Sequence, residues 1–120
     1  MSSIIVLMQI ILALGILNVW LLRYGRPTGW RGGSARNMKE EFQVYGLPAW
    51  SVQVIGFLKL LCAVLLIAGI WLPALTKPAA IGMAVLMIGA IAMHFKVKDP
   101  VKRSLPAFIM LVLSAIVALA

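Results

Sequence analysis

Between Ser51 and Leu72 the chain reads SVQVIGFLKLLCAVLLIAGIWL, and the only charged residue in this stretch is Lys59. The stretch is 22 residues long, and a helix needs about 20 apolar residues to cross a bilayer. An ionisable side chain inside such a helix costs about 2.5–3.5 kcal/mol on insertion scales, and it usually faces a partner or a wet cavity. The stretch therefore predicts a membrane helix, and Lys59 indicates where a site should lie.

Three more apolar runs predict membrane helices, at about residues 4–22, 78–95 and 105–120. Hydrophobic residues make up 63% of the chain and charged residues 12%, whereas a soluble domain has about 25% charged residues. We expect an all-α fold in which residues 1–120 form a single integral membrane four-helix bundle. Ser104 is the expected N-cap of the last helix. That helix would extend only about 24 Å, less than a hydrocarbon core of about 30 Å.

Basic residues are unequally divided among the connections. The first connection carries five and the third carries four, whereas the second has only Lys77. By the positive-inside rule the first and third connections are cytoplasmic and both termini are extracytoplasmic. A net charge of +8 would suggest nucleic acid in a soluble protein. Here it fits topology signals and anionic lipid headgroups, so we expect a multi-pass protein of a bacterial inner membrane and no nucleic-acid partner.

A short amphipathic helix is predicted in the first connection, at about residues 37–45. Asn37 can cap it because Glu40 follows at the capping-box spacing, and Met38, Phe42 and Tyr45 recur on one face. We expect this helix to lie in the membrane interface between the first two spans. Aromatic residues are expected to form belts at the two membrane edges. The belt residues are Trp20, Tyr24, Tyr45, Trp50 and Trp71.

Four segments together carry a family resemblance: FQVYGLPAW at 42–50, IGFLKLL at 55–61, LIAG at 66–69 and HFKVKD at 94–99. With these segments the chain resembles the DoxX-like family of small four-helix membrane proteins. The resemblance implies a bundle with a re-entering or interfacial segment before the second helix. Family members include membrane subunits linked to thiosulfate oxidation with quinone as acceptor, and a distant animal relative is a receptor-assembly chaperone. Many members carry an acid where this chain has Lys59, so functions tied to that acid do not carry over.

Six polar residues form the candidate ligand-binding set: Asn18, Glu40, Glu41, Lys59, His94 and Asp99. Lys59 lies about nine residues past Trp50, so about 13 Å deep, and snorkelling alone leaves its ammonium short of water. The small neighbours Gly56 and Ala63 allow close helix contact, which predicts that Lys59 faces the bundle. One interpretation is that Lys59 forms a ligand or proton site. The alternative is a structural lysine bonded to carbonyls or to one carboxylate.

The remaining polar residues each have a structural alternative as well. His94 ends the third run, where a helix C-terminus favours a cation. Asp99 could fold back on His94 or Lys59, or serve only as a turn residue before a proline. Gln9 and Asn18 are expected to make interhelical hydrogen bonds.

Metal, thiol and nucleotide chemistry find little support in the sequence. Met83, Met87 and His94 share a stripe that could bind Cu(I), but methionine is a common core residue, and we expect no metal site. Cys62 is the only cysteine, which excludes the quinone-linked oxidoreductases that form disulfides through cysteine pairs. No phosphate-binding loop, dinucleotide motif or Ser-His-Asp set is present.

Three functions fit these observations. The first is an auxiliary membrane subunit of a redox-associated assembly that binds a quinone-like or lipid-like molecule. Quinone is then the candidate cofactor, and a redox enzyme or another membrane protein is the candidate partner; the redox link comes from the resemblance alone. The second is a membrane-protein assembly factor or chaperone. The third is a small transporter, which would need a homo-oligomer because four short helices enclose little volume. The sequence names no catalytic residue and leaves open whether the protein is an enzyme.

Overall fold

The computed structural model describes residues 3–22, 24–25, 32–33 and 35–120, and these residues form helices and turns. The helical elements are α1 (Ser3–Leu17), η1 (Asn18–Leu22), α2 (Met38–Val44), α3 (Trp50–Ala68), η2 (Pro73–Leu75), α4 (Thr76–Lys96), η3 (Val101–Ser104) and α5 (Leu105–Leu119). Within the described part, four helical spans are long and apolar enough to cross a membrane. The predicted all-α membrane bundle is therefore confirmed.

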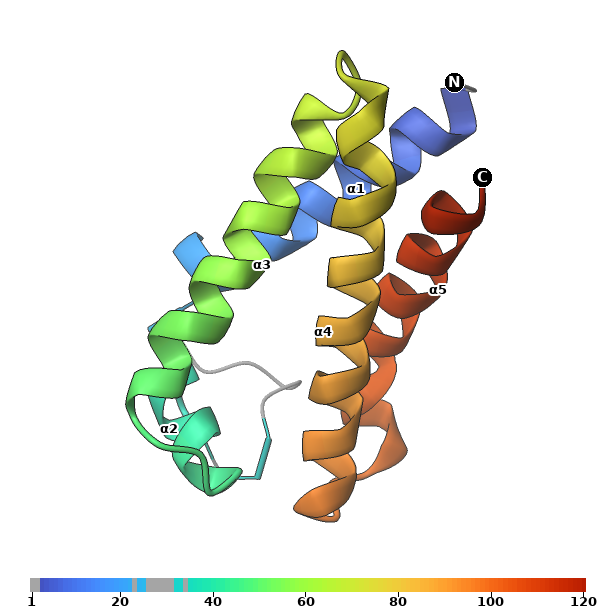
Figure 1. Cartoon of the computed structure of the whole chain (residues 1–120). Helices are drawn as coiled ribbons and strands as arrows, with labels where there is room; N and C mark the ends of the chain where they lie inside the picture. Colours follow the sequence, from blue (N-terminus) through green and yellow to red (C-terminus); the bar gives the residue numbers. More distant parts are fainter. Residues whose placement is uncertain (1–2, 23, 26–31, 34) are drawn as a thin grey trace.

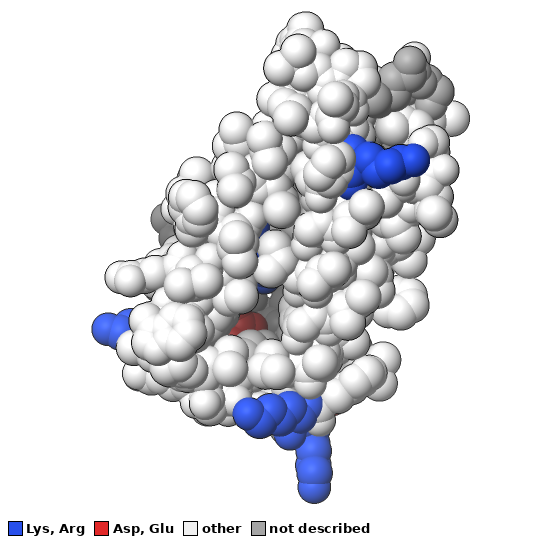
Figure 2. All heavy atoms as spheres, in the orientation of Figure 1, with Lys and Arg blue, Asp and Glu red and all other residues white. Residues whose placement is uncertain are grey.

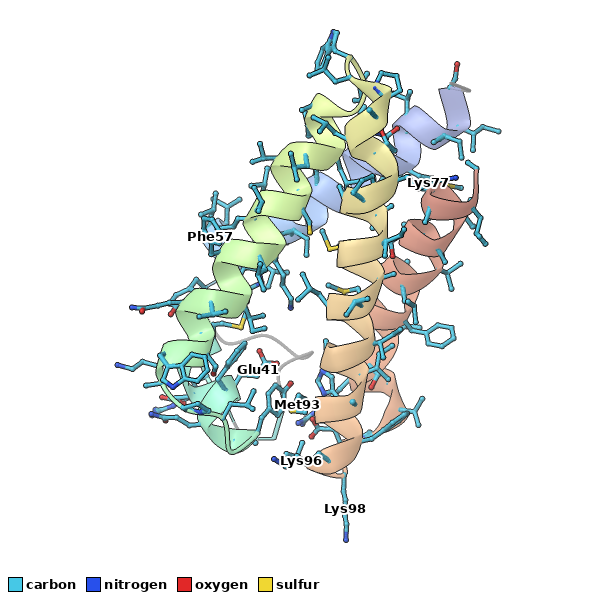
Figure 3. The ribbon with its side chains drawn as sticks, in the orientation of Figure 1. Glu41, Phe57, Lys77, Met93, Lys96 and Lys98 are labelled. Carbon is cyan, nitrogen blue, oxygen red and sulfur yellow. The ribbon has the colours of Figure 1, made fainter. Side chains whose placement is uncertain are left out.

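The four long helices close into a ring, because α1 packs against α3 and α5, and α4 packs against the same two helices. The start of α1 and the end of α5 lie at one end of the bundle, and α2 lies at the other, beside the start of α3 (Figure 1). Lys96 and Lys98 lie at the α2 end, whereas Lys77 lies toward the opposite end (Figure 3). We call these the basic end and the far end. Arg23, Arg26 and Arg31 of the first connection lie outside the described residues.

Apolar side chains fill the inside of the ring and also cover its outside. Leu12, Leu66 and Met83 are fully buried between the helices, whereas Phe57 is 65% exposed and Val85 is 61% exposed. A helix that is hydrophobic all round belongs in the core of a large protein or in a membrane. The outer faces of this bundle therefore require lipid around them.

Two helix boundaries differ from the sequence-based expectation. α3 ends at Ala68, because Gly69 lies against Thr76, whose hydroxyl donates a 3.1 Å hydrogen bond to the Gly69 carbonyl. The last span begins earlier than expected, because the 3₁₀ turn η3 continues directly into α5. The combined span is 19 residues, or about 30 Å. The expected mismatch with the bilayer therefore disappears.

The expected N-cap role of Ser104 is wrong. Ser104 precedes α5 with helical dihedral angles, φ −82° and ψ −7°, and makes no side-chain cap hydrogen bond. An N-cap residue normally has extended backbone, but here the chain is already helical from Val101. The Ser104 hydroxyl is buried and has no hydrogen-bond partner among the described residues.

The expected aromatic belt is wrong for two of its members. Trp20 and Tyr45 are each only 6% exposed, whereas Trp50 is 63% and Trp71 75% exposed. Trp20 lies in the π-helical turn η1 and packs on Gly56, where a side chain would collide with the indole ring. Tyr45, the residue after α2, faces the bundle because it continues the side of α2 that carries Met38 and Phe42, which are also buried.

Candidate functional site

The short helix α2 forms for the local reasons that the sequence suggested, and it brings one acid into the bundle. Asn37 caps it by accepting a 2.8 Å hydrogen bond from the Glu40 N–H. Gly46, with φ +77°, ends it in a conformation that glycine adopts readily. The buried face of α2 also carries Glu41, which is only 8% exposed. Figure 3 shows Glu41 between α2 and α4, and Figure 2 shows an acidic side chain at the same place, inside a hollow beside α3 and α4.

The other acid of α2, Glu40, takes no part in this cluster. Its carboxylate accepts hydrogen bonds from the backbone N–H and the guanidinium of Arg36, whose side chain is 79% exposed. These hydrogen bonds, with the charge of Arg36, hold the pKa of Glu40 below its ordinary value of 4.5. Glu40 was part of the predicted ligand-binding set, but the structure places it toward the outside.

The C-terminus of α4 folds Asp99 back onto His94, one of the two partners that the spacing had left open. The Lys98 N–H donates to the Phe95 carbonyl at 3.1 Å and the Asp99 N–H donates to the His94 carbonyl at 3.0 Å. These two hydrogen bonds form a Schellman motif, which needs a left-handed residue at its turn. Lys98 fills that position with φ 58°. The motif places the Asp99 carboxylate directly beside the His94 ring.

Asp99 is the hub of the polar contacts at the basic end. Its Oδ2 lies 2.8 Å from His94 Nδ1, and its Oδ1 lies 3.1 Å from the Arg103 guanidinium. The same carboxylate accepts a 3.0 Å hydrogen bond from the Gly33 N–H, and Arg103 donates to the Gly33 carbonyl. The Asp99 side chain is only 4% exposed. One carboxylate therefore joins the first connection to α4 and η3.

The environment of Asp99 favours its ionised form. Burial by itself would raise the pKa of the carboxyl group. The hydrogen bonds from His94 and Gly33, with the charges of His94 and Arg103, outweigh burial and hold the pKa below its ordinary value of 3.8. Hydrogen bonds and opposite charges stabilise a carboxylate in this way. Asp99 is therefore a permanent anion near neutral pH.

Tyr45 continues the polar contacts from His94 into the bundle. Its hydroxyl donates a 3.0 Å hydrogen bond to Glu41 Oε1 and lies 3.5 Å from His94 Nε2. Glu41 Oε1 also accepts a 2.9 Å hydrogen bond from the Gly32 N–H. Lys96 donates a 2.7 Å hydrogen bond to the Tyr45 carbonyl. These contacts fix the tyrosine between one acid and one imidazole.

Lys59 completes the cluster from α3. Its Nζ lies 5.4 Å from the centroid of the Trp20 ring, a cation–π distance. The Glu41 carboxylate attracts the Lys59 charge electrostatically. In the described part of the chain the Lys59 ammonium donates no hydrogen bond. The indole Nε1 of Trp20 is buried and is likewise without an acceptor there.

The structure thus divides the six predicted ligand-binding residues. Glu41, His94 and Asp99 are joined through Tyr45 at the basic end, Lys59 lies on α3 beside Trp20, and Glu40 points away from them. Asn18 begins the π-helical turn that carries Trp20. The site also contains six residues outside the predicted set: Trp20, Gly32, Gly33, Tyr45, Lys96 and Arg103. Two signals were available in the sequence, the shared α2 face for Tyr45 and the i,i+4 spacing from Asp99 for Arg103.

A second polar contact lies in the far half of the bundle and has a structural explanation. The Gln9 side-chain amide is fully buried and donates hydrogen bonds to the Leu66 carbonyl at 2.8 Å and to the Thr76 hydroxyl at 3.3 Å. The predicted interhelical role of Gln9 is confirmed, because these bonds join α1 to α3 and α4. In a bundle surrounded by lipid, such bonds hold helices together.

Comparison with known proteins agrees with this architecture. The sequence model of the DoxX-like family matches residues 29–117, which include α2, all of α3 and α4, and most of α5. No curated protein and no solved structure matches the chain. The match covers well over half of the 120 residues and includes every segment on which the resemblance rested. The chain belongs to the DoxX-like family.

Proposed function

We propose that this protein is an auxiliary membrane subunit that holds a quinone-like or lipid-like molecule by its oxygen atoms at Lys59 and Trp20. The observation that carries the proposal is the half-buried Lys59 ammonium, which lies 5.4 Å from the Trp20 ring centroid and donates no hydrogen bond to the described residues. Beside it, the indole N–H of Trp20 is a buried donor without an acceptor among the described residues, and such a donor costs about 1–3 kcal/mol. A bound carbonyl, carboxylate or phosphate oxygen would remove that cost.

Trp20 supports the same proposal from α1. Its indole N–H is a donor only, it is buried, and it lacks an acceptor in the described structure. It belongs to a π-helical turn, and such turns occur frequently at functional sites. Two donors from different helices therefore call for a molecule with acceptor oxygens, and the carbonyl groups of a quinone meet that requirement.

The apolar surroundings fit a ligand with a hydrocarbon chain. A groove of about 410 Å³ runs along α1 and α3 toward the far end, lined by Leu17, Ala63, Val64, Ile67, Ala68 and Trp71. Ala63 is one helical turn beyond Lys59, and Leu17 is one turn before Trp20. We propose that the groove takes the isoprenoid or acyl chain of the ligand.

Partner and location belong to the same proposal. The DoxX-like family supports a membrane protein, and the resemblance to subunits linked to quinone supports a redox-associated assembly. We propose that the basic end faces the cytoplasm of a bacterial cell, because basic connections are retained on that side. Both chain termini are then extracytoplasmic.

Binding of short-chain ubiquinone and menaquinone analogues to the purified protein tests the proposal. In lipid nanodiscs, Lys59→Met should weaken binding roughly 10- to 150-fold, because a charge-assisted hydrogen bond of about 1.5–3 kcal/mol is lost. The matched control is Lys77→Met, which removes an exposed lysine near the far end and should leave binding unchanged. Equal affinities of the wild type and Lys59→Met would refute the proposal. Binding of phosphatidylglycerol but of neither quinone would assign the site to an anionic lipid.

A further inference from the structure

The connection from α4 to α5 carries positive charge that no acid of the protein balances. Lys96, Lys98 and Lys102 are all exposed there, and Figure 2 shows basic side chains projecting from the basic end. We call residues 96–102 the basic turn. The chain has only three acids, and each has partners elsewhere: Asp99 pairs with His94 and Arg103, Glu40 pairs with Arg36, and Glu41 accepts a hydrogen bond from Tyr45. An anion that balances these lysines must therefore come from outside the chain.

Lys98 holds its charge at a backbone position that favours glycine. Its φ of 58° is left-handed, and the residue at this point of a Schellman motif is usually glycine, because a Cβ is disfavoured there. Figure 3 shows the Lys98 side chain pointing away from the bundle, beyond the end of α4. A strained residue that persists is a reason to look for a function. Since the fold itself is better served by glycine, the function belongs to the Lys98 ammonium.

The basic turn directly adjoins exposed apolar side chains. Val101 is 74% exposed, and Phe95 and Leu105, on either side of the turn, are 58% and 48% exposed. The outer faces of the bundle require lipid, so the headgroup layer begins where this apolar surface ends. Lysine stems pack on apolar surface while their ammonium groups reach the polar layer. A lipid boundary offers both parts at once, phosphate groups for the lysines and hydrocarbon for Val101 and Phe95.

We propose that Lys96, Lys98 and Lys102 bind the phosphate groups of anionic phospholipids, with Lys98 as the residue kept for this purpose. A lysine ammonium carries several donors. Lys96 donates one hydrogen bond to the Tyr45 carbonyl, so it keeps further donors for a phosphate oxygen. Attraction to an anionic membrane surface changes binding by about fivefold for each basic residue. The basic turn lies outside the bundle, so this surface is independent of the interior site proposed above.

Native mass spectrometry of the detergent-purified protein, titrated with phosphatidylglycerol or with zwitterionic phosphatidylcholine, tests the surface. The wild type should bind phosphatidylglycerol more tightly than phosphatidylcholine. Lys98→Gly and Lys98→Gln should each weaken phosphatidylglycerol binding about fivefold, because one charge is lost. Lys98→Arg keeps the charge and should bind as the wild type does. The matched control is Lys77→Gln, which removes an isolated exposed lysine toward the far end and should leave the preference unchanged.

Thermal unfolding of the same variants without anionic lipid separates binding from folding. Lys98→Gly relieves the backbone strain and should melt at a higher temperature than Lys98→Gln, although both bind the lipid weakly; equal melting temperatures count against a strained lysine kept for binding. The proposal is overturned if either variant binds phosphatidylglycerol as tightly as Lys77→Gln, or if the wild type binds both lipids alike. Lys59→Met should keep the wild-type preference, and its loss would place the anionic lipid inside the bundle instead. Failure of quinone binding leaves these results unchanged.

Discussion

Two glycines in the middle of helices should respond in opposite ways to the same substitution. Glycine to alanine normally stabilises a helix by about 0.5–1 kcal/mol. At Gly89 nothing lies within 4 Å of an added Cβ, so Gly89→Ala should show this gain. At Gly56 the added Cβ would lie 2.5 Å from Cζ3 and 2.8 Å from Cε3 of Trp20. Overpacking of this kind costs about 1–3 kcal/mol, so Gly56→Ala should lower the free energy of unfolding by about 1–2 kcal/mol.

The Trp20 ring cannot easily move out of the way. It packs edge-on against the Phe42 ring, with the ring centroids 6.0 Å apart, and at a tilt against the Tyr24 ring, with the centroids 5.9 Å apart. The assay is reversible unfolding in mixed micelles, followed by circular dichroism so that a change in indole fluorescence does not interfere. In the Trp20→Leu background the penalty of Gly56→Ala should largely vanish, since the pair is then uncoupled. If Gly56→Ala stabilises the protein as much as Gly89→Ala does, the Trp20 ring does not fill the space beside Gly56.

Further predictions concern the basic end. Asp99→Ala should cost about 2–5 kcal/mol in the free energy of unfolding, because the His94 ring and the Gly33 N–H lose their acceptor. Glu40→Ala, which removes an acid outside this cluster, should stay near wild type. The folded-state pKa of Asp99 is lowered, so its contribution should be complete above pH 3.8 and be lost as the pH falls below that value; a wild-type advantage over Asp99→Asn that already disappears at neutral pH would contradict this. Phe42→Asp should destabilise α2 packing far more than Gln43→Asp, measured by thermal unfolding, and equal effects would mean that α2 is not docked. Reporter fusions should place the C-terminus outside the cytoplasm, and cytoplasmic reporter activity would reverse the topology.

Much of the fold could be predicted because the ability of a segment to cross a membrane as a helix depends mainly on its length and its apolar composition. Apolar runs long enough to cross a bilayer became helices, and the Asn37–Glu40 spacing became a capped start of α2. The helix ends were harder to predict. Whether a turn is 3₁₀ or α depends on local hydrogen bonds, which the hydropathy pattern does not report. The 3₁₀ turns η2 and η3, which lengthen the last two spans, were therefore not predicted.

The candidate site could be predicted only in part. Lys59, Glu41, His94 and Asp99 were found because ionisable groups are rare in this chain and costly in lipid. Trp20 was missed because position alone suggested a membrane edge. The π-helical turn that places it inside has no sequence signature beyond the polar Asn18. Gly33 was missed because its contribution is a backbone N–H and a carbonyl, which every residue offers.

The central claim, a ligand with acceptor oxygens at Lys59 and Trp20, is tested most directly by identifying what remains bound to the protein. Wild type, Lys59→Met and Lys77→Met are purified from the same membranes, extracted with organic solvent and analysed by mass spectrometry. We expect a quinone at close to one molecule per chain in the wild type and in Lys77→Met, and its loss in Lys59→Met. If all three proteins carry only bulk phospholipids in the proportions of the host membrane, the claim is contradicted.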